Sequence, residues 1–190
     1  GRLRIVEEMA CGVRAGLGQA RAQGVGAAQQ LDQQRRQVPA LGAKQGQLLE
    51  GETAGLLLRL RAAYPQALIA AGTTDVGLWV TKQHRRFGQI IDVTRVRELR
   101  RIERGAHSLS IGAAASLTEA FDALAESRPQ LKPFFDRFAG LPVRESGTLG
   151  GNVANGSPIG DSMPLLIALG ATLVLASTRG ERTLPIEDFY

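Results

Sequence analysis

The feature that most constrains the fold is the glycine-rich segment at residues 146–152, SGTLGGN, followed closely by residues 157–161, SPIGD. Glycines allow positive φ angles and let the backbone approach a ligand closely, here at Gly147, Gly150 and Gly151. Hydroxyl, amide and carboxylate groups accompany them, at Thr148, Asn152, Ser157 and Asp161. The segment therefore predicts a backbone shaped around a bound anion or cofactor.

A second turn of similar character lies earlier, at residues 71–77, AGTTDVG, directly after the apolar run 67–70. A helix that begins at Thr73 or Thr74 would present free amides and hydroxyls, which suit a pyrophosphate. A tight turn with a threonine cap is an equally good interpretation of this segment alone. Two such turns in one chain indicate a long ligand with two ends.

Composition excludes several kinds of chemistry. The 190 residues include one cysteine, Cys11, and two histidines, His84 and His107. One thiol cannot form a disulfide framework or carry an iron–sulfur cluster, and these histidines, interpreted as surface residues, lack the spacing of a zinc site. We therefore expect no metal site and no catalytic side chains of the chain's own, with redox chemistry left to a bound cofactor.

The net charge of +5 and pI of about 10.1 fit a basic surface for anionic small molecules. Nucleic acid is not expected as a partner, because the arginines are dispersed among few aromatic residues. No apolar run approaches the roughly 20 residues of a membrane helix, and no secretory signal is evident, so we expect no membrane association and a cytoplasmic location. The start at Gly1 and the end at Tyr190 suggest a fragment.

The chain divides into two parts by amino-acid composition. Residues 1–51 are rich in Ala, Gln, Gly and Arg and are left unassigned, as a disordered or helical arm. Residues 52–190 form the folded domain, with a first lobe over about 52–108 and a second over about 109–190. The first lobe is predicted to contain a helix at 56–63, a strand at 67–70, a helix from Thr73 or Thr74, and a strand at 89–93 parallel to the first.

The second lobe is predicted to contain a strand at 109–114, helices at 117–126, 132–138 and 163–169, and a hairpin of 172–176 with 182–186. Ser116 and Glu119 form a capping box for the first of these helices. Phe138 and Trp79 are interpreted as core residues, and Asp161 as a helix cap. The fold class is α+β, with a small βαβ lobe, a more antiparallel lobe and a groove between them.

A nicotinamide-binding fold is an alternative, because Asp92 ends a strand about 20 residues after the first turn. The glycine spacing of residues 71–77 does not match that fold, however, and no P-loop pattern is present. A basic nucleic-acid module that binds through the arm is a third alternative.

Residues 71–82, 109–114, 138–140, 147–152 and 155–161 together resemble the FAD-binding domain of the xanthine dehydrogenase small subunit. The resemblance covers about residues 56–190 and extends to the molybdenum hydroxylases more widely, including carbon monoxide dehydrogenase medium chains. It implies a two-lobed, PCMH-type flavin fold that continues beyond Tyr190. The implied cofactor-binding residues are Ile69, Ala70, Ala71, Gly72, Thr73, Thr74, Asp75, Val76, Phe138, Thr148, Gly151, Asn152, Ser157 and Asp161.

The resemblance also implies a role in purine oxidation. Electrons from a molybdopterin-binding large subunit would pass through an iron–sulfur domain to FAD on this chain, and then to NAD. A carbon monoxide dehydrogenase-like or other aromatic or aldehyde hydroxylase is the alternative within the family. The chain departs from the family pattern at Thr73, where a second glycine is frequent, and at Glu145, where asparagine is common.

Overall fold

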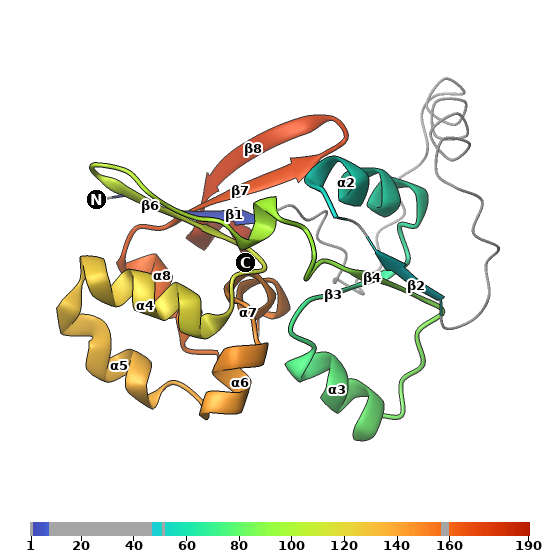
Figure 1. Cartoon of the computed structure of the whole chain (residues 1–190), viewed down its shortest axis with the longest axis horizontal. Helices are drawn as coiled ribbons and strands as arrows, with labels where there is room; N and C mark the ends of the chain where they lie inside the picture. Colours follow the sequence, from blue (N-terminus) through green and yellow to red (C-terminus); the bar gives the residue numbers. More distant parts are fainter. Residues whose placement is uncertain (1, 8–46, 51, 157–159) are drawn as a thin grey trace.

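The structure is a computed structural model that describes residues 2–7, 47–50, 52–156 and 160–190. Two sheets organise it (Figure 1). The five strands of the larger sheet are, in spatial order, β5 (Ile102–Arg104), β6 (Ser108–Gly112), β1 (Arg2–Glu7), β7 (Thr172–Ser177) and β8 (Gly180–Pro185). The three of the smaller sheet are β2 (Gln47–Glu50), β4 (Gln89–Asp92) and β3 (Leu68–Ala70).

The larger sheet is mixed. Its two outer pairs, β5–β6 and β7–β8, are antiparallel hairpins, and the hairpin predicted at 172–186 is confirmed. Its centre is parallel, because β1 pairs in parallel with both β6 and β7. The second lobe is thus antiparallel only at its edges. β5 also belongs to this sheet, although its residues lie before the expected boundary between the lobes at 108 and 109.

Two short stretches of the unassigned segment 1–51 are strands. Arg2–Glu7 form the middle strand of the larger sheet, and Gln47–Glu50 form an edge of the smaller one. The alternation of arginine with Leu3 and Ile5 is a strand signal. It was missed because residues 1–51 were interpreted together from their overall composition, which is rich in Ala, Gln, Gly and Arg. Residues 8–46, including the rest of the expected arm, lie outside the described residues.

Helices flank both sheets (Figure 1). In that view α2 (Ala54–Ala63) lies above the smaller sheet and α3 (Thr74–Thr81) below it. Below the larger sheet lie α4 (Leu117–Ser127), α5 (Lys132–Arg137), α6 (Leu141–Ser146), α7 (Leu149–Asn155) and α8 (Ser162–Ala168). Short 3₁₀ turns occupy Glu98–Arg100, Pro129–Leu131 and Ile186–Phe189.

The predicted helices and strands agree with these bounds within a few residues. The capping box of α4 is confirmed: the Glu119 amide donates to Ser116 Oγ at 3.1 Å, and the Ser116 amide donates to Glu119 Oε2 at 2.8 Å. β3 and β4 are parallel, as expected for a βαβ unit. The capping box was a strong signal because it depends on two residues only three positions apart.

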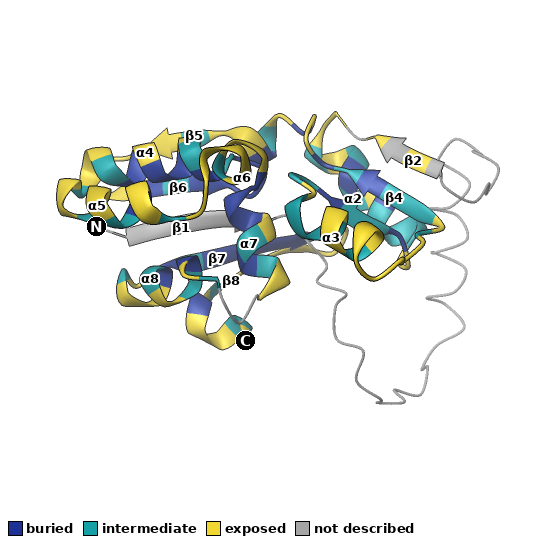
Figure 2. Cartoon of the chain, turned by 90° about the horizontal axis from the view of Figure 1, so that it is seen from below, coloured by how far each residue is buried: buried dark blue, intermediate teal, exposed yellow. Residues whose placement is uncertain are grey.

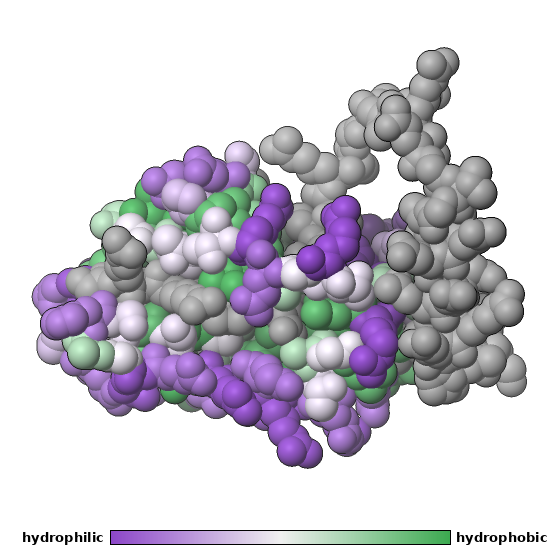
Figure 3. All heavy atoms as spheres, turned by 90° about the horizontal axis from the view of Figure 1, so that it is seen from above, coloured by the Kyte–Doolittle hydropathy of each residue, from purple (hydrophilic) through white to green (hydrophobic). Residues whose placement is uncertain are grey.

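Each sheet has its own core (Figure 2). The larger core surrounds Ile111, Leu124 and Leu173, and the smaller one surrounds Leu57 and Ile91. The cores meet where the chain leaves β6, because Ala113 and Ala114 pack in the smaller core and Ala115 in the larger. On the face shown in Figure 3, hydrophobic residues appear in small areas among hydrophilic side chains.

The glycine-rich segment 146–152 is not a turn of positive φ. Gly147 has φ −66°, while Gly150 and Gly151 lie within α7. Among the described residues, the glycines with φ in the left-handed region are Gly156, Gly170 and Gly180. The prediction of positive φ at 147, 150 and 151 is therefore wrong, and these glycines serve close packing instead.

Trp79 is a further correction. It was expected in the core, but α3 contains no buried residue and Trp79 is only half-buried. Its ring lies 6.3 Å from that of Phe87, and the Arg85 guanidinium lies 4.8 Å from the Trp79 ring centre. The residue forms a local cation–π cluster at the end of α3.

Candidate cofactor site

The first turn presents an uncapped helix N-terminus. Thr73 is the N-cap of α3, and its side chain makes no capping hydrogen bond. Its φ of 55° lies in the left-handed region, which a β-branched residue rarely adopts. A glycine at position 73 would adopt this φ without strain. The first-turn amides of α3 carry partial positive charge and receive no capping oxygen from Thr73, so they suit an anion.

The second glycine segment ends in a helix start that is already capped. Thr148 is only 7% exposed, and its Oγ1 accepts a hydrogen bond from the Gly151 amide at 3.1 Å. The Leu149 amide donates to the Ala115 carbonyl at 3.1 Å, and the Gly150 amide to the Ala113 carbonyl at 3.0 Å. The backbone amides of this segment already donate hydrogen bonds to groups of the protein. A ligand here would therefore be contacted by side chains.

Asn152 is oriented by a buried hydroxyl. Ser162 is fully buried at the start of α8, and its Oγ donates a hydrogen bond to Asn152 Oδ1. The amide oxygen is thereby used within the protein, and the Nδ2 group is the part of Asn152 that remains to donate. Ser162 was not predicted as part of the site, although its position next to Asp161 was a signal.

The two turns meet in a close backbone contact. A Cβ at Gly72 would lie 1.7 Å from the Ser146 carbonyl oxygen, and one at Gly147 would lie 3.7 Å from Thr74 Cγ2. A further contact joins the helices, because Asn155 Nδ2 donates to Asp75 Oδ2 at 2.8 Å. The first and second turns thus form one seam between the lobes.

Phe138 and Asp161 line one hollow of about 300 Å³ together with Pro133, Phe134 and Arg137. Phe138 is half-buried, and its ring meets Phe121 edge-on at 4.8 Å between centroids. Phe138 is thus both a contact of the larger core and a wall of the hollow. Asp161 precedes α8 without a side-chain capping bond, so its predicted capping role is not seen.

Arg144 fixes the backbone on which Phe138 lies. Its Nη1 lies within 3.1–3.3 Å of the carbonyl oxygens of Phe135, Asp136, Phe138 and Ala139. A guanidinium bound to carbonyls at the end of α5 offsets the negative end of the helix dipole. The single-sequence pattern gave no signal for this contact.

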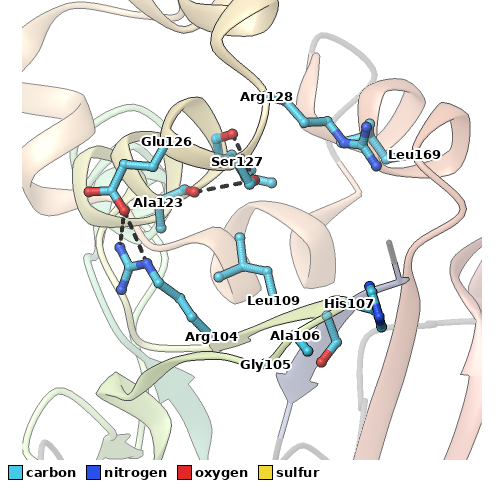
Figure 4. A pocket seen from close by; sticks show the side chains of 12 residues that line it. Arg104, Gly105, Ala106, His107, Leu109, Ala123, Glu126, Ser127, Arg128 and Leu169 are labelled. Atoms are coloured by element: carbon cyan, nitrogen blue, oxygen red, sulfur yellow. Dashed lines mark hydrogen bonds and ion pairs between the residues drawn. The ribbon is translucent and has the colours of Figure 1, made fainter.

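A larger hollow of about 480 Å³ lies between the β5–β6 turn and the end of α4 (Figure 4). Arg104 and Glu126 form an ion pair on one side of it, and Arg128 and His107 lie on the other. None of the predicted cofactor residues lines it. Phe138 and Asp161 line the smaller hollow instead, and Gly72, Thr74 and Asp75 lie at the seam.

The structure places Ile69 and Ala70 on β3 and Ala71–Val76 along the first turn and α3. Ala70 is buried, and its carbonyl accepts from the Val93 amide at 3.0 Å. Of the second set, Ser157 lies outside the described residues. Within the described part of the chain, no group of three or more His, Cys, Asp or Glu side chains could bind a metal, and no helix has the length and hydrophobicity to cross a membrane.

Residues 45–190 match the model of the family described as the FAD binding domain in molybdopterin dehydrogenase. The chain belongs to this family. Its mixed fold is similar to those of solved structures: the TM-score is 0.69 with quinoline 2-oxidoreductase from Pseudomonas putida 86, at 27% identity over 75% of this chain and 50% of that one. With carbon monoxide dehydrogenase from Hydrogenophaga pseudoflava it is 0.71, at 25% identity over 79% and 53%.

Curated relatives include xanthine dehydrogenases. The chain is 38% identical to that of Drosophila subobscura over 64% of this chain and 10% of the relative. It is 34% identical to the xanthine dehydrogenase FAD-binding subunit of Escherichia coli O157:H7 over 70% of this chain and 47% of that subunit. The chain thus spans a tenth of one relative and about half of the other.

The residues present fit FAD. The uncapped amides of α3 suit the pyrophosphate, and the hollow beside Phe138 offers an aromatic wall to a flat ring. In Figures 1 and 2 α6 and α7 lie on the side of the larger lobe toward α3, and α7 is joined to α3 by the Asp75–Asn155 hydrogen bond. The hollow beside Phe138 lies farther from α3, between the end of α5 and the start of α8. The donor set is therefore suited to an elongated ligand with an anionic middle.

Proposed function

We propose that this FAD-binding domain is the electron relay of a xanthine dehydrogenase-like molybdenum hydroxylase. Purine oxidation would take place on a molybdopterin-binding subunit, and iron–sulfur clusters of a partner domain would deliver electrons to this chain. Bound FAD supplies the step from one-electron carriers to a two-electron acceptor, which we propose is NAD. The similarity to xanthine dehydrogenases supports this proposal.

The observation that carries the proposal is the uncapped α3 N-terminus at the seam. We propose that residues 69–76 surround the pyrophosphate and its neighbouring sugar. Phe138, Thr148, Gly151, Asn152, Ser157 and Asp161 would contact or support the remainder. The chain's own work is to bind, to orient and to exclude water, and none of its side chains is assigned a catalytic step.

We propose two lobes with the cofactor between them, one on each sheet, formed mainly by residues 52–190 and completed by β1 and β2 from the segment 1–51. The separate cores support this division, because each sheet buries its own cluster of hydrophobic residues. The pairing of β5 with β6 supports a junction of the lobes before residue 102 instead of at 108 and 109.

A second candidate is the flavin subunit of a carbon monoxide dehydrogenase-like enzyme. The structural likeness to the Hydrogenophaga pseudoflava enzyme favours it. Nicotinamide binding by the chain itself and nucleic-acid binding gain no support from the comparisons. The two remaining candidate functions differ in the partner subunits and in the substrate of the complete enzyme.

The test is a titration of the purified chain with FAD, followed by flavin absorbance and fluorescence. We expect stoichiometric binding with quenched or shifted flavin bands, and no xanthine turnover until a molybdopterin and iron–sulfur partner is added. Failure to bind FAD would refute the assignment of the site. Turnover of carbon monoxide but not xanthine in the reconstituted complex would favour the second candidate.

A further inference from the structure

We propose that Asp75 and Asn155 form a clamp between the lobes, and that Asp75 acts on the cofactor by positioning α3 rather than by touching it. The inference rests on the proposed function, because it concerns how the FAD cleft is kept in shape. It assigns Asp75 a different role from the direct contact that the resemblance implied.

The clamp is a hydrogen bond between residues 80 positions apart. Asp75 lies in the first turn of α3, and its Oδ2 accepts from Asn155 Nδ2, at the last residue of α7, at 2.8 Å. The acceptor is a carboxylate, so the bond is stronger than one between neutral groups. It joins the helix that starts at the first turn to the helix that starts at the second.

The direction of the Asp75 side chain argues against contact with a phosphate. A carboxylate in the first turn of a helix can interact with the same amides that would bind an anion. It would also repel a pyrophosphate placed there. The hydrogen bond to Asn155 instead engages one of its oxygens across the seam, and a positioning role follows.

The clamp works beside a second contact of a different kind. The backbone of Gly72 lies directly against the Ser146 carbonyl, where a Cβ would be only 1.7 Å away. That contact fixes the approach of the lobes just before α3 begins. A single point of contact leaves a helix free to pivot, whereas a second one at Asp75 fixes the direction in which its N-terminus points.

Exposure limits the size of the effect. Asn155 is exposed and Asp75 half-buried, so water competes for both groups. Loss of the bond should therefore shift the balance between well-oriented and misoriented α3 without unfolding the chain. We expect about a tenfold loss of FAD affinity, the change that corresponds to about 1.4 kcal/mol.

The experiment exchanges the two side chains. Asn155→Asp places two carboxylates against each other and should weaken FAD binding about tenfold. The double variant Asp75→Asn with Asn155→Asp restores a carboxylate–amide pair, with the donor and acceptor reversed, and should return affinity to within about threefold of the parent. Asp75→Asn alone removes the carboxylate of the pair, and Asp122→Asn, on an exposed part of α4, is its control for a lost charge.

Hydrogen exchange of the chain without FAD gives an independent readout. Asn155→Asp should speed exchange of the α3 amides, and the double variant should slow it again. If Asp75 contacts FAD directly, both variants that carry Asp75→Asn will weaken binding, Asn155→Asp will not, and apo exchange will not change. That pattern would overturn the clamp.

The same measurements separate this inference from the proposed function. A parent chain that binds no FAD refutes the proposed site, while apo exchange still decides whether the clamp exists. A parent chain that binds FAD, with unchanged affinity and exchange in Asn155→Asp, refutes the clamp alone.

Discussion

The two glycine-rich segments look alike in sequence and differ in structure. Residues 71–77 end in an uncapped helix with a strained Thr73 at its start. Residues 146–152 lead into α7, which is capped by a buried Thr148 and tied by its amides to residues 113 and 115. The first segment has backbone donors left for a ligand, whereas those of the second are largely used by the protein.

The difference shows that a glycine-rich segment has more than one meaning. At Gly72 and Gly150 the absent side chain makes room for the protein's own backbone. Glycine also permits close approach to a ligand, but these two contacts are already filled. Three predictions test this comparison of the two segments.

The largest effect is expected for Gly72→Ala and Gly150→Ala. The new Cβ would lie 1.7 Å from Ser146 O in one case and 2.4 Å from Ala113 Cβ in the other. Because backbone must move in both, we expect a loss of about 3 kcal/mol in unfolding free energy, measured by urea denaturation. FAD affinity should fall with it.

Gly77→Ala is the matched control for these variants. A Cβ at Gly77 meets nothing within 4 Å and lies on an exposed part of α3. Alanine is the better helix former by about 1 kcal/mol, so this variant should be at least as stable as the parent. If Gly72→Ala matched the stability of Gly77→Ala and lost only FAD binding, Gly72 would be a ligand contact and not a packing residue.

Smaller changes in unfolding free energy are expected at the two threonine caps, a loss at Thr148 and a gain at Thr73. Thr148→Ala removes the acceptor of the Gly151 amide and should cost about 1 kcal/mol. Thr73→Gly relieves the left-handed strain and should add about 0.5–1 kcal/mol, since the flexibility of glycine in the unfolded chain offsets part of the gain. Thermal unfolding of both variants measures this difference.

Thr73→Ala is the control for backbone strain, because alanine also disfavours the left-handed region. Its stability should remain near that of the parent. A stabilisation equal to that of Thr73→Gly would show that φ at residue 73 is not the cause.

Local signals predicted most of the fold. The Ser116–Glu119 box and the β7–β8 hairpin each depend on residues close together in the sequence. The central strand β1 was missed, because its partners lie about a hundred positions or more along the chain and its neighbours in sequence are poor in strand formers.

The site was predictable as a set of segments but not as a geometry. Of the residues that the resemblance selected, Gly72, Thr74 and Asp75 lie at the seam, and Phe138 and Asp161 line the hollow. The resemblance could not reveal that Ser162 orients Asn152, that Asn155 reaches Asp75, or that Arg144 supports Phe138. Each of these contacts joins residues from different helices or turns, and a single sequence contains no record of such pairs.

The smallest effect on stability is expected at Asp161, which also separates binding from folding most cleanly. Asp161 is exposed, makes no capping bond and lines the hollow with Phe138. Asp161→Ala should therefore change unfolding free energy by less than about 0.5 kcal/mol. If its carboxylate accepts a hydrogen bond from bound FAD, affinity should fall about tenfold. Asp136→Ala is the control, since Asp136 is exposed on α5 and pairs with Lys132 outside the hollow. Equal FAD affinity in the two variants, measured by flavin titration, would remove Asp161 from the site and leave Phe138 as the contact of that hollow.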